Sequence, residues 1–198
     1  MKKIFKKLFS VDRIDLISQH FNLKNPSILE ICVHRGDFSR ELFENFNPKK
    51  LTLVDPWIAF DDPEYSNSFY GNKNKDGQSL QDQYYDEVVK NFNNEIKNYK
   101  VEIVRDTSDN FFKKNIIEFD LIYIDGNHIY EFVKNDIFNS LKSLKQGGII
   151  VLDDYKLKGW WKNGVTKAVN YYHTNNKVNL LAKHDFFNYH HQCILSKI

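Results

Sequence analysis

Three carboxylates stand where two apolar stretches of the sequence end. Asp125 closes the stretch FDLIYID, and Asp153 and Asp154 close the stretch GIIVLDD. Carboxylates crowded into a partly dry cleft repel one another, so a cation or basic side chains must offset their charge. Their hard oxygen atoms suit Mg²⁺, Mn²⁺ or Ca²⁺ better than a metal that prefers thiolates. The pattern favours a divalent-metal site over the plainer alternative, in which these aspartates cap helices or form turns.

Two other residues would suit a nucleoside ligand. Gly36 follows the first apolar stretch, ILEICV, and allows a tight turn before a helix whose amino end can receive a carboxylate. Asp55 ends the second stretch, LTLVD, about 20 residues further on, where an acid can hold the hydroxyls of a ribose. One glycine after a strand is as typical of an ordinary turn as of a cofactor loop, so the two signals count together. Glu30 lies inside the first apolar stretch, where we expect it to have a hydrogen-bonding partner.

A buried sheet must position these residues. Five short apolar stretches, typical of strands buried on both faces, are separated by segments of helical character. The predicted strands are residues 28–33, 51–55, 101–104, 119–125 and 148–154, and the predicted helices between them are residues 37–46, 79–99, 106–115 and 130–145. This alternation predicts an α/β fold, Rossmann-like and doubly wound, with a mostly parallel sheet that binds ligands at the carboxyl ends of its strands.

The remaining segments complete one predicted domain over residues 1–198. After a helix near residues 164–172, two strand-like stretches at 177–183 and 191–198 predict a C-terminal antiparallel hairpin. Residues 56–78 are rich in Asp, Asn, Gly, Ser and aromatic side chains. A loop of that length is usually functional, and we predict that it forms a lid on the substrate side.

Composition disfavours several other classes of protein. Lys and Arg number 28 against 26 Asp and Glu, and the resulting net charge of +2 disfavours a nucleic-acid partner. Cys32 and Cys193 are too few and too far apart for a disulfide framework, which fits a reducing cytoplasm. No apolar run reaches the length of about 18 residues that a membrane span needs, and residues 1–25 are predicted to be an N-terminal helical segment without an assigned function. We expect a cytoplasmic protein and leave open whether it forms a homo-oligomer.

Together, these residues resemble the class I S-adenosylmethionine (SAM)-dependent methyltransferases, and within them the bacterial small-molecule and sugar O-methyltransferases. The likeness spans about residues 28–172, in the pieces ILEICVHRGDFS, LVDPW, FDLIYIDGNHIYEFVKNDI, LKQGGIIVLDDY and NGVTKAV. It implies that SAM is the cofactor. In such enzymes the first loop lies along the methionine part of SAM, which implicates Glu30, Cys32, His34 and Gly36. The resemblance also places Asp55 at the ribose, Asp125 within the cofactor site, and the three residues Asp106, Thr107 and Ser108 beside the adenine.

The same resemblance implies a metal-assisted mechanism. Metal-dependent members hold their ion through acids after the fourth and fifth strands, so Asp125, Asp153 and Asp154 would bind a divalent cation, with Mg²⁺ expected. The cation would bind the oxygen atom to be methylated, while His128 removes its proton near neutral pH. Catalysis is therefore assigned to His128 and Asp125. The acceptor implied is a small molecule, such as a sugar or a sugar nucleotide.

Several alternatives stay open at this point. His128 could make a structural hydrogen bond instead of acting as a base. The enzyme could be a metal-independent methyltransferase for an amine or a carboxylate, or a catalytically silent SAM-binding or partner protein, because Cys32 stands where the family motif has glycine. A nicotinamide dehydrogenase is disfavoured, since no GxGxxG follows the first predicted strand.

Aromatic residues occur on the long loop and after the fifth predicted strand, and histidines occur in the predicted hairpin. The aromatic residues could form a wall for a sugar ring or a planar acceptor, or could simply pack the long loop onto the domain. They are Trp57, Phe60, Tyr65, Phe69, Tyr70, Trp160 and Trp161. Histidines in the predicted hairpin are more typical of an edge strand or an interface than of a ligand site; they are His184, His190 and His191.

Overall fold

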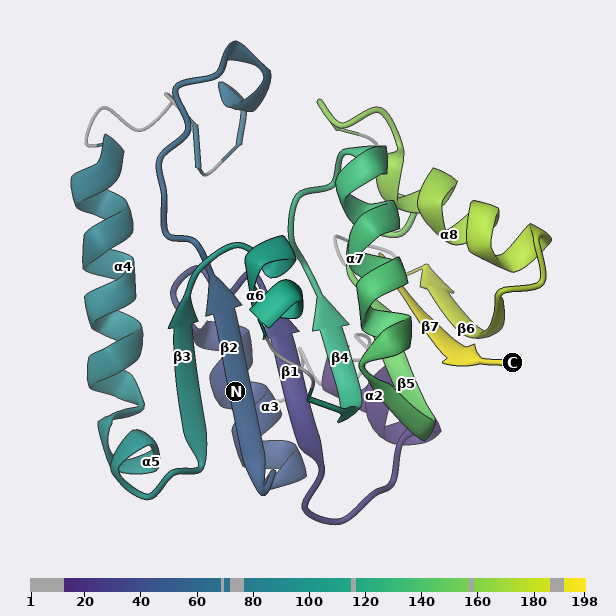
Figure 1. The fold of residues 1–198 in the computed structure, drawn as a ribbon, viewed down its shortest axis with the longest axis horizontal. Helices are drawn as coiled ribbons and strands as arrows, with labels where there is room; N and C mark the ends of the chain where they lie inside the picture. The colour runs from purple at the N-terminus through teal and green to yellow at the C-terminus, as the bar shows by residue number, and fades with distance from the viewer. Residues whose placement is uncertain (1–12, 69, 72–76, 115–116, 157–158, 186–190) are drawn as a thin grey trace, which may run out of the picture.

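The computed structural model describes residues 13–68, 70–71, 77–114, 117–156, 159–185 and 191–198. Within them the chain forms a seven-stranded sheet in the order β3-β2-β1-β4-β5-β7-β6 (Figure 1). Five strands are parallel: β1 (Ser27–Ile31), β2 (Lys50–Asp55), β3 (Val101–Arg105), β4 (Phe119–Ile124) and β5 (Leu144–Leu152). This is the doubly wound, mostly parallel sheet that the sequence predicts.

The predicted C-terminal hairpin is also confirmed. Strand β7 (His191–Lys197) pairs antiparallel with β5 on one side and with β6 (Val178–Asp185) on the other. The turn expected between these two strands, residues 186–190, lies outside the described residues. His184 and His191 lie on β6 and β7, with β6 at the edge of the sheet as expected, and His190 is not described.

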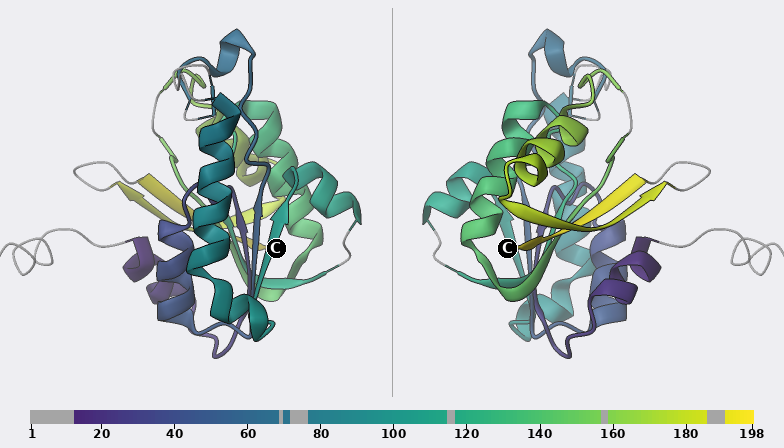
Figure 2. Two further views of the ribbon diagram at one scale, coloured as in Figure 1. Left: turned by 90° about the vertical axis from the view of Figure 1, so that its left-hand side faces the viewer. Right: turned by 90° about the vertical axis from the view of Figure 1, so that its right-hand side faces the viewer.

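Helices cover both faces of the sheet, as Figure 2 shows from two sides. The core on one face joins the sheet to α6 (Ser108–Lys114), α7 (Tyr130–Lys142) and α8 (Gly164–Thr174). The core on the other face joins it to α2 (Arg13–His20), α3 (Asp37–Phe46) and α4 (Gly77–Asn91). Alternate strand residues point to opposite faces, so Ile122 of β4 joins the first core and Tyr123 joins the second.

Several element boundaries differ from those predicted; in particular, α7 ends at Lys142 and β5 begins at Leu144, inside the helix predicted over residues 130–145. The helix expected over residues 79–99 divides into α4 and α5 (Asn93–Lys97), with the fully buried Phe92 between them. The helix expected from residue 106 begins at Ser108, because Asp106 lies before its first turn. Strand β1 ends at Ile31, since Cys32 adopts a left-handed backbone conformation with φ of 64° that no strand continues.

Two predicted segments are described only in part. Residues 1–12 of the predicted N-terminal helical segment lie outside the described residues, and α2 is the helix that follows them. In the predicted lid, residue 69 and residues 72–76 are not described, while the rest contains the short 3-10 helix η1 (Pro63–Tyr65). The Phe60 backbone N–H donates a 2.7 Å hydrogen bond to the Tyr70 carbonyl, which ties the lid to itself. None of the described helices is long and apolar enough to cross a membrane.

Candidate active site

Two adjoining cavities lie at the carboxyl ends of the parallel strands. The small cavity, of about 270 Å³, has Val54, Thr107, Ser108 and Asp136 in its lining. The lining of the large cavity, of about 490 Å³, includes Arg13 and six predicted site residues: Glu30, His34, Asp125, His128, Asp153 and Asp154. Cys32, Tyr70, Gly126 and Trp160 border both cavities, so the two spaces are contiguous. A larger hollow of about 620 Å³ between α7 and α8 is remote from these residues.

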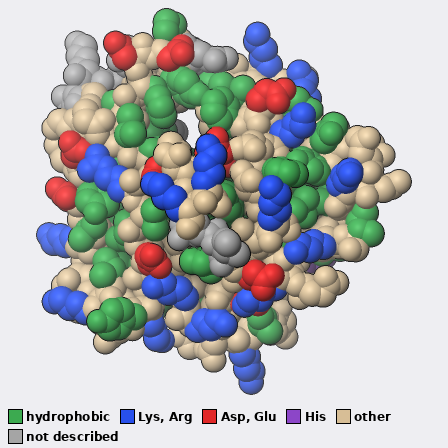
Figure 3. Space-filling model, in the orientation of Figure 1, with side chains coloured by type: hydrophobic (Ala, Val, Ile, Leu, Met, Phe, Trp, Pro, Cys, Tyr) green, Lys and Arg blue, Asp and Glu red, His purple; other side chains and the backbone are tan. Residues whose placement is uncertain are grey.

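The rim of the small cavity is largely apolar. Phe60, Tyr65, Phe132 and Trp160 are part of its lining. Figure 3 shows hydrophobic side chains gathered around a hollow above the sheet, on the side to which the parallel strands point in Figure 1. A concave, mostly apolar space with a few polar groups is typical of a small-molecule or cofactor site.

The loop after β1 turns through three residues with left-handed backbone conformation. Cys32, His34 and Gly36 have φ angles of 64°, 53° and 79°. Such an angle costs a residue with a side chain about 1 to 2 kcal/mol, which explains why a glycine is favoured where this chain has Cys32. Gly36 also needs its small size, because a Cβ atom there would lie 3.1 Å from Val88. The absence of a side chain at Gly36 therefore lets the turn pack against α4.

Glu30 has the hydrogen-bonding partner that its place in β1 predicts. The Ser39 hydroxyl of α3 donates a hydrogen bond to its buried carboxylate. Burial raises the pKa of Glu30 to about 8. At neutral pH the side chain is therefore largely protonated, so the large cavity has a neutral acid in its wall at this point.

Asp55 is fully buried, and its carboxylate is bonded within the protein. Its Oδ2 accepts hydrogen bonds from the backbone N–H groups of Val33 at 2.9 Å and His34 at 3.0 Å, and Oδ1 accepts one from Trp57 at 2.7 Å. The Tyr70 hydroxyl donates to Oδ2 at 2.6 Å. Asp55 thus holds the first loop in shape. A ribose hydroxyl would have to take the place of the Tyr70 hydroxyl to reach it.

The structure separates the three residues predicted beside the adenine. Asp106 is not in the lining of the small cavity; it accepts from the Thr107 backbone N–H at 2.9 Å and pairs with Lys114 at 2.7 Å, while Thr107 caps α6 by accepting from the Asn110 backbone N–H at 3.2 Å. The hydrogen bond from Lys114 is the main reason that the pKa of Asp106 is lowered. Thr107 and Ser108 do line the cavity, and the Ser108 hydroxyl donates a 2.6 Å hydrogen bond to the buried Asp136. Burial raises the pKa of Asp136 to about 7.

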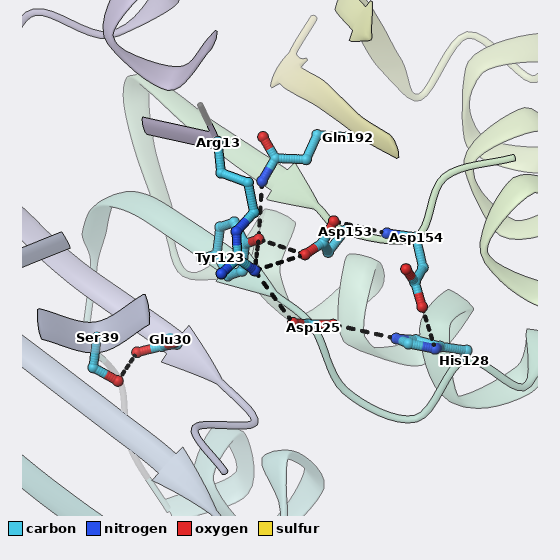
Figure 4. A network of polar contacts seen from close by, with 9 residues as sticks. All are labelled: Arg13, Glu30, Ser39, Tyr123, Asp125, His128, Asp153, Asp154 and Gln192. Atoms are coloured by element: carbon cyan, nitrogen blue, oxygen red, sulfur yellow. Dashed lines mark hydrogen bonds and ion pairs between the residues drawn. The ribbon is translucent and has the colours of Figure 1, made fainter. Parts of the chain in front are cut away.

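Arg13 lies beside two of the three predicted metal ligands, Asp125 and Asp153 (Figure 4). Its Nη1 atom is 3.0 Å from Asp153 Oδ2 and 4.0 Å from Asp125 Oδ2. The Tyr123 hydroxyl donates to the same Asp153 oxygen at 2.9 Å, and Gln192 donates to Tyr123 at 2.9 Å. The Asp154 backbone N–H donates to the other Asp153 oxygen at 3.0 Å. Both oxygens of Asp153 therefore already have protein partners.

His128 bridges the other two carboxylates. Its Nδ1 is 3.1 Å from Asp154 Oδ2, and its Nε2 is 3.4 Å from Asp125 Oδ1. Partial burial and the neighbouring Asp153 carboxylate raise the pKa of Asp125 to about 6. Gly164, the first residue of α8, lets this loop and helix pack closely, since a Cβ atom there would clash with the His128 carbonyl oxygen. The backbone at His128 is thus fixed by packing against α8.

These residues, as placed, do not fit a divalent cation. Among the residues that the structure describes, no three His, Cys, Asp or Glu side chains form a group that could hold a metal ion. The physical reason is that Arg13 and His128 lie between the carboxylates and supply the compensating charge that Asp125, Asp153 and Asp154 need. Compensation by basic side chains, the alternative to a cation, is the arrangement of these residues in the structure.

Part of the predicted aromatic wall exists. Ring contacts run from Phe60 to Tyr65 at 4.8 Å, from Tyr65 to Trp160 at 5.6 Å and from Trp160 to Trp161 at 5.9 Å. Trp161 then meets the His128 ring at 4.8 Å. The wall joins the lid to the segment after β5, and it borders both cavities.

Two other aromatic residues serve a different purpose, and one is not described. Trp57 is fully buried in the core, packs on Tyr85 at 5.2 Å and donates from Nε1 to the His34 carbonyl. Tyr70 is bonded to Asp55, as above, and Phe69 lies outside the described residues. Packing, which was the alternative to an acceptor wall, is therefore the observed arrangement at Trp57.

Residues 29–155 match the family model of a methyltransferase domain, which is well over half of the chain. The chain belongs to this methyltransferase family. A search among curated proteins gave no significant match. The methyltransferase also shares its fold with an rRNA methylase from Streptococcus thermophilus, at a TM-score of 0.61 and 13% identity, over 96% of this chain and 99% of that one.

Two further solved structures are similar to this methyltransferase. One is TrmK of M. capricolum in complex with S-adenosylhomocysteine, at a TM-score of 0.60 and 12% identity, over 96% of this chain and 69% of that one. The other is precorrin-6y C5,15-methyltransferase from Geobacter metallireducens, at 0.59 and 14%, over 97% and 91%. Identities this low show the common fold alone. Family and fold together identify a methyltransferase that shares the fold of these enzymes.

Proposed function

We propose that the methyltransferase transfers the methyl group of SAM to a hydroxyl group of a small molecule bound in the large cavity, with His128 as general base. The observation that carries this proposal is the pairing of His128 with Asp154 at the cavity wall. A carboxylate on Nδ1 orients the imidazole ring, and a substrate hydroxyl can replace the longer 3.4 Å contact between Nε2 and Asp125. The proposed transfer needs no divalent ion, since Arg13 and His128 already compensate the charge of the carboxylates.

The charge around His128 sets the pH at which it can act. Burial alone would lower the pKa of His128, but Asp125 and Asp154 outweigh burial and raise it above the usual value. The neutral, basic form is then populated at mildly alkaline pH. We expect the rate of methyl transfer to rise with pH through this raised pKa. Asp154→Asn removes one of the carboxylates, so the rise should move to lower pH in a pH–rate profile.

The two cavities suggest where the parts of SAM lie. Thr107 and Ser108 support adenine in the small cavity, and we assign the buried Asp136, rather than Asp106, to its 6-amino group. The ribose reaches Asp55 by displacing the Tyr70 hydroxyl. The methionine part extends into the large cavity along a wall that includes Glu30, Cys32, His34 and Asp125, with Gly36 shaping the turn.

A pair of nucleosides tests this placement without any acceptor. S-adenosylhomocysteine carries an amino group at position 6, whereas S-inosylhomocysteine carries an oxygen there. A carboxylate that accepts a hydrogen bond from the amino group should bind S-adenosylhomocysteine about tenfold more tightly, which corresponds to the free energy of one hydrogen bond. Asp136→Asn should remove most of that preference in calorimetric titrations, and Asp106→Asn should leave it unchanged. A preference lost with Asp106→Asn instead would contradict the placement.

The wall of the large cavity favours a neutral acceptor. Asp37, Asp125, Asp153 and Asp154 contribute carboxylates to its lining, against the cations of Arg13 and Arg35. Phosphate groups would be repelled there, which disfavours nucleic acid and makes a sugar a better acceptor than a sugar nucleotide. Trp160 and Trp161 offer flat apolar surfaces on which a sugar ring or a planar acceptor can stack.

The acceptor class can be tested with SAM that carries a labelled methyl group. Label should enter hydroxylated sugars or hydroxylated planar compounds as a methyl ether. The variant His128→Gln should lower the rate by about 10²- to 10⁴-fold, the usual contribution of a general base. His173→Gln, on the exposed end of α8, is the matched control and should not change the rate. Label found only in amines or RNA, or a rate insensitive to His128→Gln, would contradict the proposal.

A further inference from the structure

Asp125, Asp153 and Asp154 form a carboxylate cluster, and the cation that contacts two of them is the side chain of Arg13 in α2. Arg13 comes from α2, whereas Asp153, its partner at 3.0 Å, lies 140 residues further along the chain. Asp125, 4.0 Å from the same Nη1 atom, lies at the end of the neighbouring strand. A guanidinium between two carboxylates offsets their repulsion as a divalent ion would, but it stays attached to the protein and cannot be removed by chelation.

Packing holds the guanidinium in this position. It lies 4.1 Å from the centre of the Phe38 ring, in the geometry of a cation–π contact. The residues that follow it in α2, Ile14, Leu16 and Ile17, are buried in the core on that face of the sheet. The packing of α2 on the sheet therefore sets the position of Arg13, whose side chain is only 20% exposed.

We propose that Arg13 is a positioning residue that takes the place of a divalent cation in this methyltransferase. It holds Asp125 and Asp153 together, and through the hydrogen bond between Asp153 and the Asp154 backbone it supports the carboxylate that orients the ring of His128 for proton transfer. It also occupies the space between the carboxylates, so the enzyme works without a bound divalent metal. The effect on proton transfer rests on the proposed function of His128, whereas the exclusion of metal rests on the contacts of Arg13 alone.

Binding of Mn²⁺ to the full-length protein, followed by calorimetry and by the loss of the free-ion electron paramagnetic resonance signal, tests the proposal. Wild-type protein should show no saturable binding at millimolar Mn²⁺. Arg13→Ala uncovers the carboxylates and should bind Mn²⁺ saturably, with a Kd at least tenfold below the highest Mn²⁺ concentration at which the wild type shows no binding. Asp153→Asn in the Arg13→Ala background should abolish that binding. Arg13→Lys keeps a positive charge at the cluster and should behave as the wild type does.

A matched control removes a different arginine from the wall of the same cavity. Arg35 pairs with Glu87 at 2.9 Å on an exposed surface. Among the described residues, it forms no ion pair with Asp125, Asp153 or Asp154. Arg35→Ala changes the net charge of the protein by the same amount as Arg13→Ala. It should gain no Mn²⁺ site, so a site gained only by the Arg13 variant reports on the cluster itself.

Two results would overturn the proposal. One is Mn²⁺ binding by the wild type that is lost in Asp125→Asn, which would make the cluster a metal site after all. The other is a folded Arg13→Ala protein that gains no site; if that variant does not fold, Arg13→Gln, which keeps a donor for Asp153, replaces it in the same titration. Methyl transfer by wild-type protein should also persist in excess EDTA. Absence of transfer both with and without Mn²⁺ would count against the proposed function, not against the role of Arg13.

Discussion

Acids at two edges of the site are compensated in different ways. Asp55, at the end of β2, is held by three backbone N–H groups and by the hydroxyl of Tyr70. Asp153, at the end of β5, is paired with the side-chain cation of Arg13, and Asp125 and Asp154 contact the ring of His128. Backbone donors cannot be exchanged by mutation, whereas side-chain cations can. The first arrangement is therefore a fixed part of the fold, and the second can change in the course of evolution from a protein cation to a metal ion.

The largest effect is expected from Asp55→Ala. It leaves the backbone N–H groups of Val33, His34 and Trp57 without their acceptor, so we expect a loss of about 3 kcal/mol in the free energy of unfolding. Urea denaturation measures this loss. Asp106→Ala, which removes the acceptor of the Asn110 and Lys114 side chains near the surface, should cost only about 1 kcal/mol. Equal losses in the two variants would show that Asp55 does not organise the loop.

Asp153→Asn tests the second arrangement. The amide still accepts a hydrogen bond from Tyr123, but Arg13 loses the carboxylate that neutralises its charge. We therefore expect a loss of about 2 kcal/mol in the free energy of unfolding, after allowing for the partial exposure of Arg13. Removing the cation as well, in Arg13→Met with Asp153→Asn, should recover part of the loss. A double-mutant cycle by urea denaturation gives the coupling. Additive effects of the two substitutions would contradict a direct pairing.

Tyr70→Phe should change stability and ligand affinity in opposite directions. Loss of the hydrogen bond to Asp55 should lower the free energy of unfolding by about 1.5 kcal/mol. S-adenosylhomocysteine should bind severalfold more tightly, because its ribose no longer has to displace a hydroxyl from Asp55. Tyr171→Phe, on exposed α8, is the control and should alter neither quantity. An unchanged affinity in Tyr70→Phe would mean that the ribose does not use Asp55.

A further effect on stability is expected from pH. Burial raises the pKa of Glu30 to about 8, above the value of about 4.3 in an unfolded chain. The contribution of Glu30 to stability is therefore complete below a pH of about 4.3 and is lost as the pH rises toward 8. Asp136, whose pKa burial raises to about 7, acts in the same direction. Urea denaturation at pH 5 and pH 8 should show the wild type less stable at pH 8. Glu30→Gln should reduce that difference, and an unchanged difference would contradict the burial argument.

The alternation of strands and helices and the acids at the strand ends could be predicted because they depend on local patterns. Buried parallel strands read as continuous apolar runs, and residues such as Asp125 and Asp153 follow them directly in the sequence. The need for a cation or a basic partner could also be predicted from the repulsion of three carboxylates. The identity of Arg13 could not, because it lies 140 residues away from Asp153 in a segment without a motif.

Other differences have their own local causes. Asp106 was expected beside the adenine by position, but Asn110 and Lys114 lie one and two helical turns further on and draw its carboxylate away from the cavity. Asp136 was missed although a signal was present. It follows Val133 by three residues and directly precedes Ile137, so it lies on the buried face of α7, where a carboxylate needs a partner.

The most direct test is a crystal structure of the protein grown with S-adenosylhomocysteine and Mn²⁺. We predict adenine against Ser108 and Asp136, a ribose hydroxyl on Asp55 in place of the Tyr70 hydroxyl, and Arg13 still paired with Asp153. A nucleoside bound elsewhere would contradict the placement of the cofactor. A Mn²⁺ ion between Asp125 and Asp153, with Arg13 displaced, would contradict the claim that a protein side chain has taken the place of the metal.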